Sequence, residues 1–116
     1  MLAPRQNFTG DVWVNMVEMF EDGFNGSVVG KVTFETKAWT NWHKHSQGQI
    51  LIVTEGVGYY QEKESPVQII RTGDVVKIPK DTEYWHGASH NSTMVHTAIV
   101  PGGSTTWLKE VTYVFQ

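Results

Sequence analysis

Two histidines one residue apart, followed four residues later by a glutamine, are the side chains of this sequence best suited to metal chemistry. His43, His45 and Gln49 offer two imidazole nitrogens and an amide oxygen, which are good ligands for a first-row divalent cation. In a regular strand these three odd positions, together with Gln47, share one face. A solvated strand face is the competing interpretation. However, the apolar run Ile50–Val53 that follows would make two buried, unpartnered imidazoles costly.

Two later segments also place histidine on predicted strands. Tyr84 and His86 share one face of a short strand, and His96 lies on one face of the run Thr93–Val100. If these faces point into the same barrel as His43, the polar groups converge. His90 lies in a loop and is expected to be a surface residue.

Composition bounds the class of protein. The 116 residues fit one domain spanning 1–116, with 40% hydrophobic and 18% charged residues, as in an ordinary globular protein. The absence of cysteine excludes disulfides and thiolate ligands. A net charge of -3 without a basic stripe argues against nucleic acid as a partner. No membrane-length apolar run or signal peptide is recognisable, so we expect no membrane partner and a cytoplasmic location.

Short β-branched and aromatic runs separated by turn residues predict an all-β protein. Many short strands at this spacing indicate a sandwich or a barrel. The predicted strands are Val12–Val17, Ser27–Phe34, Ile50–Thr54, Gly58–Gln61, Val67–Ile70, Asp74–Ile78, Tyr84–His86, Thr93–Val100 and Leu108–Phe115.

The segment from Trp42 to Gly56 resembles the first motif of the cupins, which has two histidines one residue apart, a carboxylate or amide four residues later, and a glycine after a strand. Gly73–Pro79 followed by Tyr84–Ala88 resembles the second motif. The resemblance covers nearly the whole chain. It is closest to small single-domain cupins that include the manganese-dependent bacterial hydroxynitrile lyases. It implies an antiparallel double-stranded β-helix, the cupin jelly-roll barrel.

The resemblance also implies a ligand set. His43, His45 and Gln49 match three ligands of that subgroup, whereas the fourth, a histidine in the family, falls on Tyr84. Three outcomes stay open: a tyrosinate ligand, ligation by His86, or water in the fourth position. The implied cofactor is a divalent metal ion, manganese before iron, nickel or zinc.

The activity implied is a metal-dependent lyase reaction on a small polar substrate, such as carbon–carbon cleavage next to a hydroxyl. In such relatives the histidines matching His86 and His96 both line the pocket, and the one matching His96 is a candidate general base. The implied catalytic residue that moves the proton is His96 or His86. Neutral imidazoles suit proton transfer near neutral pH, although both could merely order water. A metal-dependent dioxygenase is one alternative. A non-enzymatic small-ligand-binding module with a weakened metal site is another, because Tyr84 departs from the pattern.

Two turns depart from the family motif. Lys37 and Asp81 stand where glycine is usual, and lysine adopts the left-handed conformation less readily than aspartate. We therefore expect the Thr36-Lys37 turn to adopt another shape.

Aromatic side chains in the terminal segments predict self-association. Strand edges and the residues Trp13, Phe20, Trp107 and Phe115 could pair across a two-fold axis. The expected assembly is a homodimer.

Overall fold

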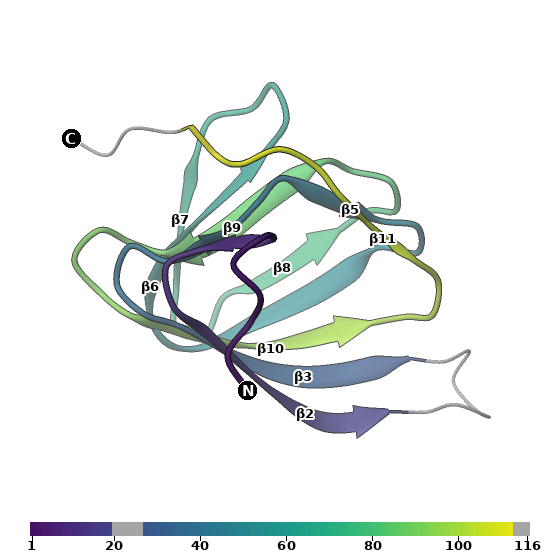
Figure 1. Ribbon diagram of the computed structural model, residues 1–116, viewed down its shortest axis with the longest axis horizontal. Helices are drawn as coiled ribbons and strands as arrows, with labels where there is room; N and C mark the ends of the chain where they lie inside the picture. Colours follow the sequence, from purple (N-terminus) through teal and green to yellow (C-terminus); the bar gives the residue numbers. More distant parts are fainter. Residues whose placement is uncertain (20–26, 113–116) are drawn as a thin grey trace.

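The computed structural model describes residues 1–19 and 27–112. These residues form eleven antiparallel strands that curl around a common interior (Figure 1). Within them no helix is long and apolar enough to cross a membrane. The eleven strands confirm the predicted all-β antiparallel fold. The strands are β1 (Phe8–Thr9), β2 (Val12–Met19), β3 (Val28–Phe34), β4 (Trp39–Thr40), β5 (His43–His45), β6 (Gln49–Glu62), β7 (Gln68–Arg71), β8 (Val75–Ile78), β9 (Tyr84–Ala88), β10 (Met94–Val100) and β11 (Thr105–Trp107).

The long strand β6 organises the barrel. Its first half pairs with β8 on one side and β10 on the other, and its second half pairs with β7 and β9. One path of hydrogen-bonded neighbours runs β1-β4-β9-β6-β10-β3-β2, while β5 joins β9 to β11. Two predicted strands, Ile50–Thr54 and Gly58–Gln61, are thus one continuous strand that belongs to both layers.

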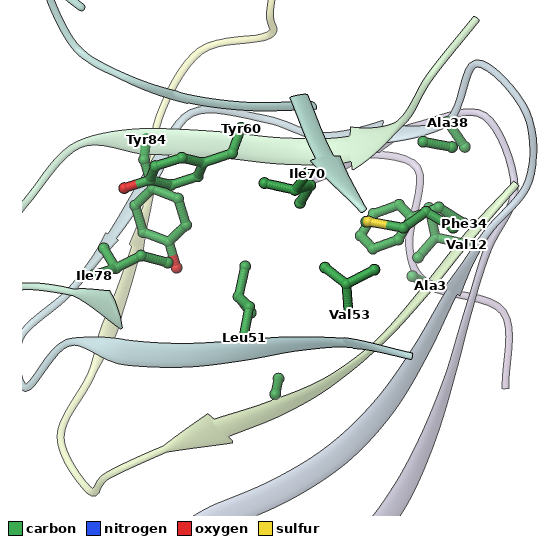
Figure 2. Close-up of a cluster of buried hydrophobic side chains, with 13 residues drawn as sticks. Ala3, Val12, Phe34, Ala38, Leu51, Val53, Tyr60, Ile70, Ile78 and Tyr84 are labelled. Carbon is green, nitrogen blue, oxygen red and sulfur yellow. The ribbon is translucent and has the colours of Figure 1, made fainter. Parts of the chain in front are cut away.

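Inward-facing side chains of this strand and its neighbours form the hydrophobic core (Figure 2). Leu51 and Val53 alternate with more exposed residues along β6, as a strand with one buried face requires. Phe34 at the end of β3 and Met94 at the start of β10 are fully buried in the same cluster. The inward-facing polar side chains of β5, β9 and β10 lie beside this core in the same barrel interior, where they can approach one another.

The predicted terminal strand Leu108–Phe115 is wrong in its described part. The strand there is β11, which ends at Trp107, and residues 108–112 are not a strand. The chain leaves β11 by hydrogen bonds from Leu108 N to the carbonyl of Trp42 and from Trp42 N to the carbonyl of Lys109. Residues 113–116, including Phe115, lie outside the described part.

A tight turn breaks the expected alternation between His45 and Gln49. Gly48 has a φ of 81° and donates its N–H to the carbonyl of His45. A Cβ at this position would lie 2.6 Å from the carbonyl oxygen of Ile78, so only glycine fits. The turn points Gln47 to solvent, contrary to the strand-parity prediction, and still returns Gln49 to the buried face.

The expectation of a different turn at Lys37 is also wrong. Lys37 and Asp81 have φ values of 64° and 59°, so both keep the left-handed conformation that glycine normally supplies. Hydrogen bonds from Lys37 N to the carbonyl of Ser89 and from Ala38 N to the carbonyl of Glu35 hold the first turn. These hydrogen bonds hold the backbone in the left-handed conformation, although this conformation is less favourable for lysine than for glycine.

Candidate metal centre

The polar side chains of the barrel interior border a cavity of about 170 Å³. They come from five strands: β4, β5, the start of β6, β9 and β10. None of the described residues that line the cavity is a lysine, an arginine, an aspartate or a glutamate. The polar lining consists of Thr40, His43, His45, Gln49, His86 and His96, and the rest is Phe8, Val14, Met16, Val28, Gly30, Val32, Phe34, Ala98, Val100 and Trp107.

The ring of His43 is buried and oriented by the main chain. Its Nδ1 lies 2.9 Å from the carbonyl oxygen of Asn41. A carbonyl can only accept a hydrogen bond, so Nδ1 carries the proton and Nε2 keeps a free lone pair. This is the tautomer and the kind of outer contact that metal-binding histidines use.

His45 lies beside His43 with a similar arrangement. The two ring centres are 5.2 Å apart and the ring planes are nearly perpendicular, at 87°. Two imidazoles that bind the same ion, each with a metal–nitrogen distance of about 2.1 Å, have ring centres roughly 5 Å apart. Nδ1 of His45 lies 3.0 Å from the hydroxyl of Thr105. The spacing of the pair therefore fits a shared divalent cation.

Gln49 and Tyr84 bring two oxygen atoms to the same place. The Tyr84 hydroxyl donates a hydrogen bond to Oε1 of Gln49, and the Tyr84 ring centre lies 4.4 Å from that of His43. Antiparallel pairing of β5 with β9 places Tyr84 directly opposite His43. Tyr84 is fully buried, and this burial raises the pKa of its phenol, with a further contribution from the neighbouring Tyr60.

Burial keeps the histidine pair neutral. Desolvation lowers the pKa of His43 to about 4, although its bond to Asn41 opposes the shift and His45 adds to it. Desolvation also lowers the pKa of His45, against the effect of a hydrogen bond with Gln49. Neutral imidazole is the form that binds metal, so the pair is ready for a cation at neutral pH.

His86 and His96 line the same cavity. Their ring centres are 5.0 Å apart, and the His86 ring lies 5.6 Å from that of His43. Within the described residues, Nδ1 of His86 and both ring nitrogens of His96 have no hydrogen-bond partner. Burial lowers the pKa of His96 to about 3. Burial, followed by repulsion from His96, His43 and His45, lowers the pKa of His86 well below its usual value.

Histidine and acidic side chains alone do not make up the candidate metal site. No group of three or more His, Cys, Asp or Glu side chains in the described ranges is arranged to hold a metal ion. His86 is therefore not grouped with His43 and His45. The donor set that converges is His43, His45 and the side-chain oxygens of Gln49 and Tyr84.

Three residues around this site were not predicted from the sequence. Asn41 contributes through its backbone, which no side-chain pattern reveals. Thr105 and Trp107 lie on β11, whose two β-branched residues before an aromatic are the one strand signal in the sequence that could have revealed them. The Trp107 ring centre lies 4.7 Å from that of His43 and 5.4 Å from that of Phe8. His90 is exposed, as expected.

The fold and the cavity define a small antiparallel β-barrel with a histidine-rich interior. Residues 30–106 match the cupin domain model, and the chain belongs to the cupin family, whose members commonly bind a metal. It is 39% identical over 114 residues to an (R)-mandelonitrile lyase from Granulicella tundricola, an alignment covering 95% of this chain and 86% of that protein.

Solved structures agree with the family assignment. A cupin-like protein from Thermotoga maritima matches with a TM-score of 0.92 at 44% identity, over 96% of this chain and 86% of that one. A cupin-2 domain from Rhodospirillum rubrum matches with a TM-score of 0.77 over 93% of this chain and 72% of its own length. At 12% identity the second match concerns the fold alone.

Proposed function

We propose that this cupin is a metal-dependent lyase that cleaves a carbon–carbon bond next to a hydroxyl group in a small neutral molecule. The relative named as an (R)-mandelonitrile lyase supports this reaction class, since its alignment spans most of both chains. A cyanohydrin is the model substrate, and its cleavage yields an aldehyde or ketone and hydrogen cyanide.

A divalent cation would be held by His43, His45 and Gln49, with the Tyr84 oxygen in the fourth position. Manganese is the ion proposed, because nitrogen and neutral oxygen donors suit it and no thiolate is present. When bound, the cation would supply positive charge that makes a nearby hydroxyl more acidic and stabilises negative charge on oxygen. The amide of Gln49 adds no charge of its own, which would preserve that effect.

The observation that carries the proposal is the pair of unpartnered imidazoles in the cavity. Buried polar groups are almost always hydrogen-bonded, so those of His96 and His86 require a partner from the cavity itself. Neutral imidazole is a proton acceptor. His96, with both nitrogens available, would take the proton of the substrate hydroxyl. The same proton would then pass to the departing cyanide, with the adjacent His86 ring, 5.0 Å away, binding that fragment or relaying the proton.

The cavity walls favour a neutral substrate with an apolar body. Phe34, Val32, Ala98 and Phe8 line it, and no charged side chain of the described residues does. An anionic substrate would lose its hydration without gaining a cationic side chain. The cavity volume of about 170 Å³ is smaller than the several hundred Å³ of sites that bind drug-sized molecules, which favours a small substrate.

A binding module without catalysis is the second candidate, favoured by the bond between Tyr84 and Gln49. That contact occupies Oε1 of Gln49, the oxygen that would face the cation. If this hydrogen bond persists when the protein is loaded with metal salts, the cation lacks Oε1 of Gln49 as a ligand and is held less tightly. The barrel would then serve to bind a ligand without catalysis.

The test is aldehyde release from an aromatic and an aliphatic cyanohydrin by protein loaded with Mn²⁺. We expect turnover by the wild type, loss of at least about 100-fold with His96→Ala, a range typical for removing a general base, and unchanged turnover with the exposed control His90→Ala. Stoichiometric Mn²⁺ without release of aldehyde from either compound would contradict the lyase and favour the binding module.

A further inference from the structure

Strand β11 lies directly against the strand that carries the two candidate ligands. Its antiparallel register pairs Thr105 with His45, Thr106 with Lys44, and Trp107 with His43. Because side chains alternate along both strands, Thr105 and Trp107 share the side of the two histidines, and Thr106 points the other way with Lys44. One short strand therefore contacts both imidazoles.

The two histidines differ in what fixes their rings. Nδ1 of His43 bonds to a backbone carbonyl, which no side-chain substitution at Asn41 would remove. Nδ1 of His45 bonds to the hydroxyl of Thr105, sixty residues away in the sequence, at 3.0 Å. Since Nδ1 is engaged there, Nε2 is the nitrogen left to face the cavity, which His45 lines.

We propose that Thr105 is a positioning residue for His45: its hydroxyl accepts the Nδ1 proton and leaves the Nε2 lone pair directed at the cation site. The inference rests on the proposed function, which places a divalent ion on His45. Outer contacts of this kind fix the tautomer and the ring angle of a ligating histidine. Their loss typically weakens metal binding by about 10- to 100-fold.

The backbone of β11 is held independently of this hydroxyl. Ser46 N donates to the carbonyl of Ser104 at 3.0 Å, and Ser104 N donates to the Ser46 hydroxyl at 2.9 Å. Beyond the strand, Leu108 N donates to the carbonyl of Trp42 at 2.8 Å. Both ends of β11 are thus fastened to the segments that flank β5. Removing the Thr105 hydroxyl should leave the strand in place.

The test compares four full-length proteins: the wild type, Thr105→Val, Thr105→Ser and Thr106→Val. Valine keeps the shape of threonine without the hydroxyl, serine restores the hydroxyl, and Thr106→Val makes the same change on the opposite side of the strand. The dissociation constant for Mn²⁺ is measured by the electron paramagnetic resonance signal of free Mn²⁺. The melting temperature of the metal-free protein monitors folding.

We expect Thr105→Val to bind Mn²⁺ roughly tenfold more weakly, toward the lower end for an outer contact because Thr105 is exposed. Thr105→Ser and Thr106→Val should bind as the wild type does, and all four should melt at similar temperatures. Equal affinity of Thr105→Val and the wild type would overturn the role of Thr105 while leaving the metal site intact. A wild type that binds neither Mn²⁺ nor another divalent ion would overturn the metal site and this role together.

Discussion

At the level of single residues, we propose that Tyr84 sets how tightly the site binds a metal ion. Its hydroxyl bonds to Gln49, its ring packs on His43, and it lies at the position for which the cupin resemblance implies a histidine. A neutral phenol is a weak metal ligand, and burial raises its pKa further. The site of this chain is therefore expected to hold its cation less tightly than a site with three imidazoles.

Restoring the histidine should tighten the site. Tyr84→His would supply a third imidazole opposite His43 and release Oε1 of Gln49 from its hydrogen bond. We expect Mn²⁺ affinity to rise by about tenfold or more, equivalent to about 1.4 kcal/mol. Calorimetric titration measures the change, with Tyr84→Phe as the control that only releases Gln49. Unchanged affinity in Tyr84→His would place Tyr84 away from the ion.

The buried histidines also predict how stability depends on pH. The pKa of His96 is about 3 in the folded protein, against an ordinary value of 6.5, so the unfolded chain binds more protons between these values. Metal-free protein should therefore lose stability as the pH falls below about 6.5.

From pH 7.5 to pH 5 the expected loss attributable to His96 is about 2 kcal/mol. Urea unfolding at the two pH values measures it, and His96→Leu should remove this part of the pH dependence. The same slope in His96→Leu and in the wild type would show that His96 is not buried in its neutral form.

At the scale of elements, sequence periodicity predicts strands well and turns poorly. It places His43, His45 and Gln49 together correctly, because two-residue alternation holds within β5 and the start of β6. It fails at Gln47, where the Gly48 turn resets the alternation. It also misses Thr105, because no local pattern reveals which strand pairs with β5 from so far along the chain.

The turn at Lys37 offers a stability test of local conformation. A non-glycine residue in the left-handed region costs about 1–2 kcal/mol, whereas glycine loses more backbone entropy on folding, by about 0.5–1 kcal/mol. Lys37 has a φ of 64°, so Lys37→Gly should stabilise the protein by up to about 1 kcal/mol. Chemical denaturation measures the change. Destabilisation would mean that the lysine side chain makes a contact that outweighs the relief of strain.

At the scale of the whole molecule, we propose a homodimer. Met1, Leu2 and Trp13 are exposed apolar residues joined by a bridge between Leu2 and Trp13, and Trp107 is 36% exposed at the cavity. Two further aromatic residues assigned to the interface, Phe20 and Phe115, lie outside the described residues. Apolar surface of this kind commonly marks an interface.

Light scattering at micromolar concentration should give twice the mass of the 13.1 kDa chain. Trp13→Glu should shift the protein toward the monomer, because an interface would have to bury the introduced charge. Thr106→Val, at another exposed position, provides a comparison. A monodisperse wild-type monomer would rule out the dimer.

Metal content per chain would show whether His43 and His45 hold a divalent cation. Tag-free wild-type protein and the variant His43→Ala/His45→Ala, both purified without chelator, are compared by elemental analysis. The prediction is close to one manganese, iron, nickel or zinc ion per wild-type chain and almost none in the variant. Equal metal content in the two proteins, or none in the wild type after incubation with each ion, would mean that His43 and His45 do not form a metal site.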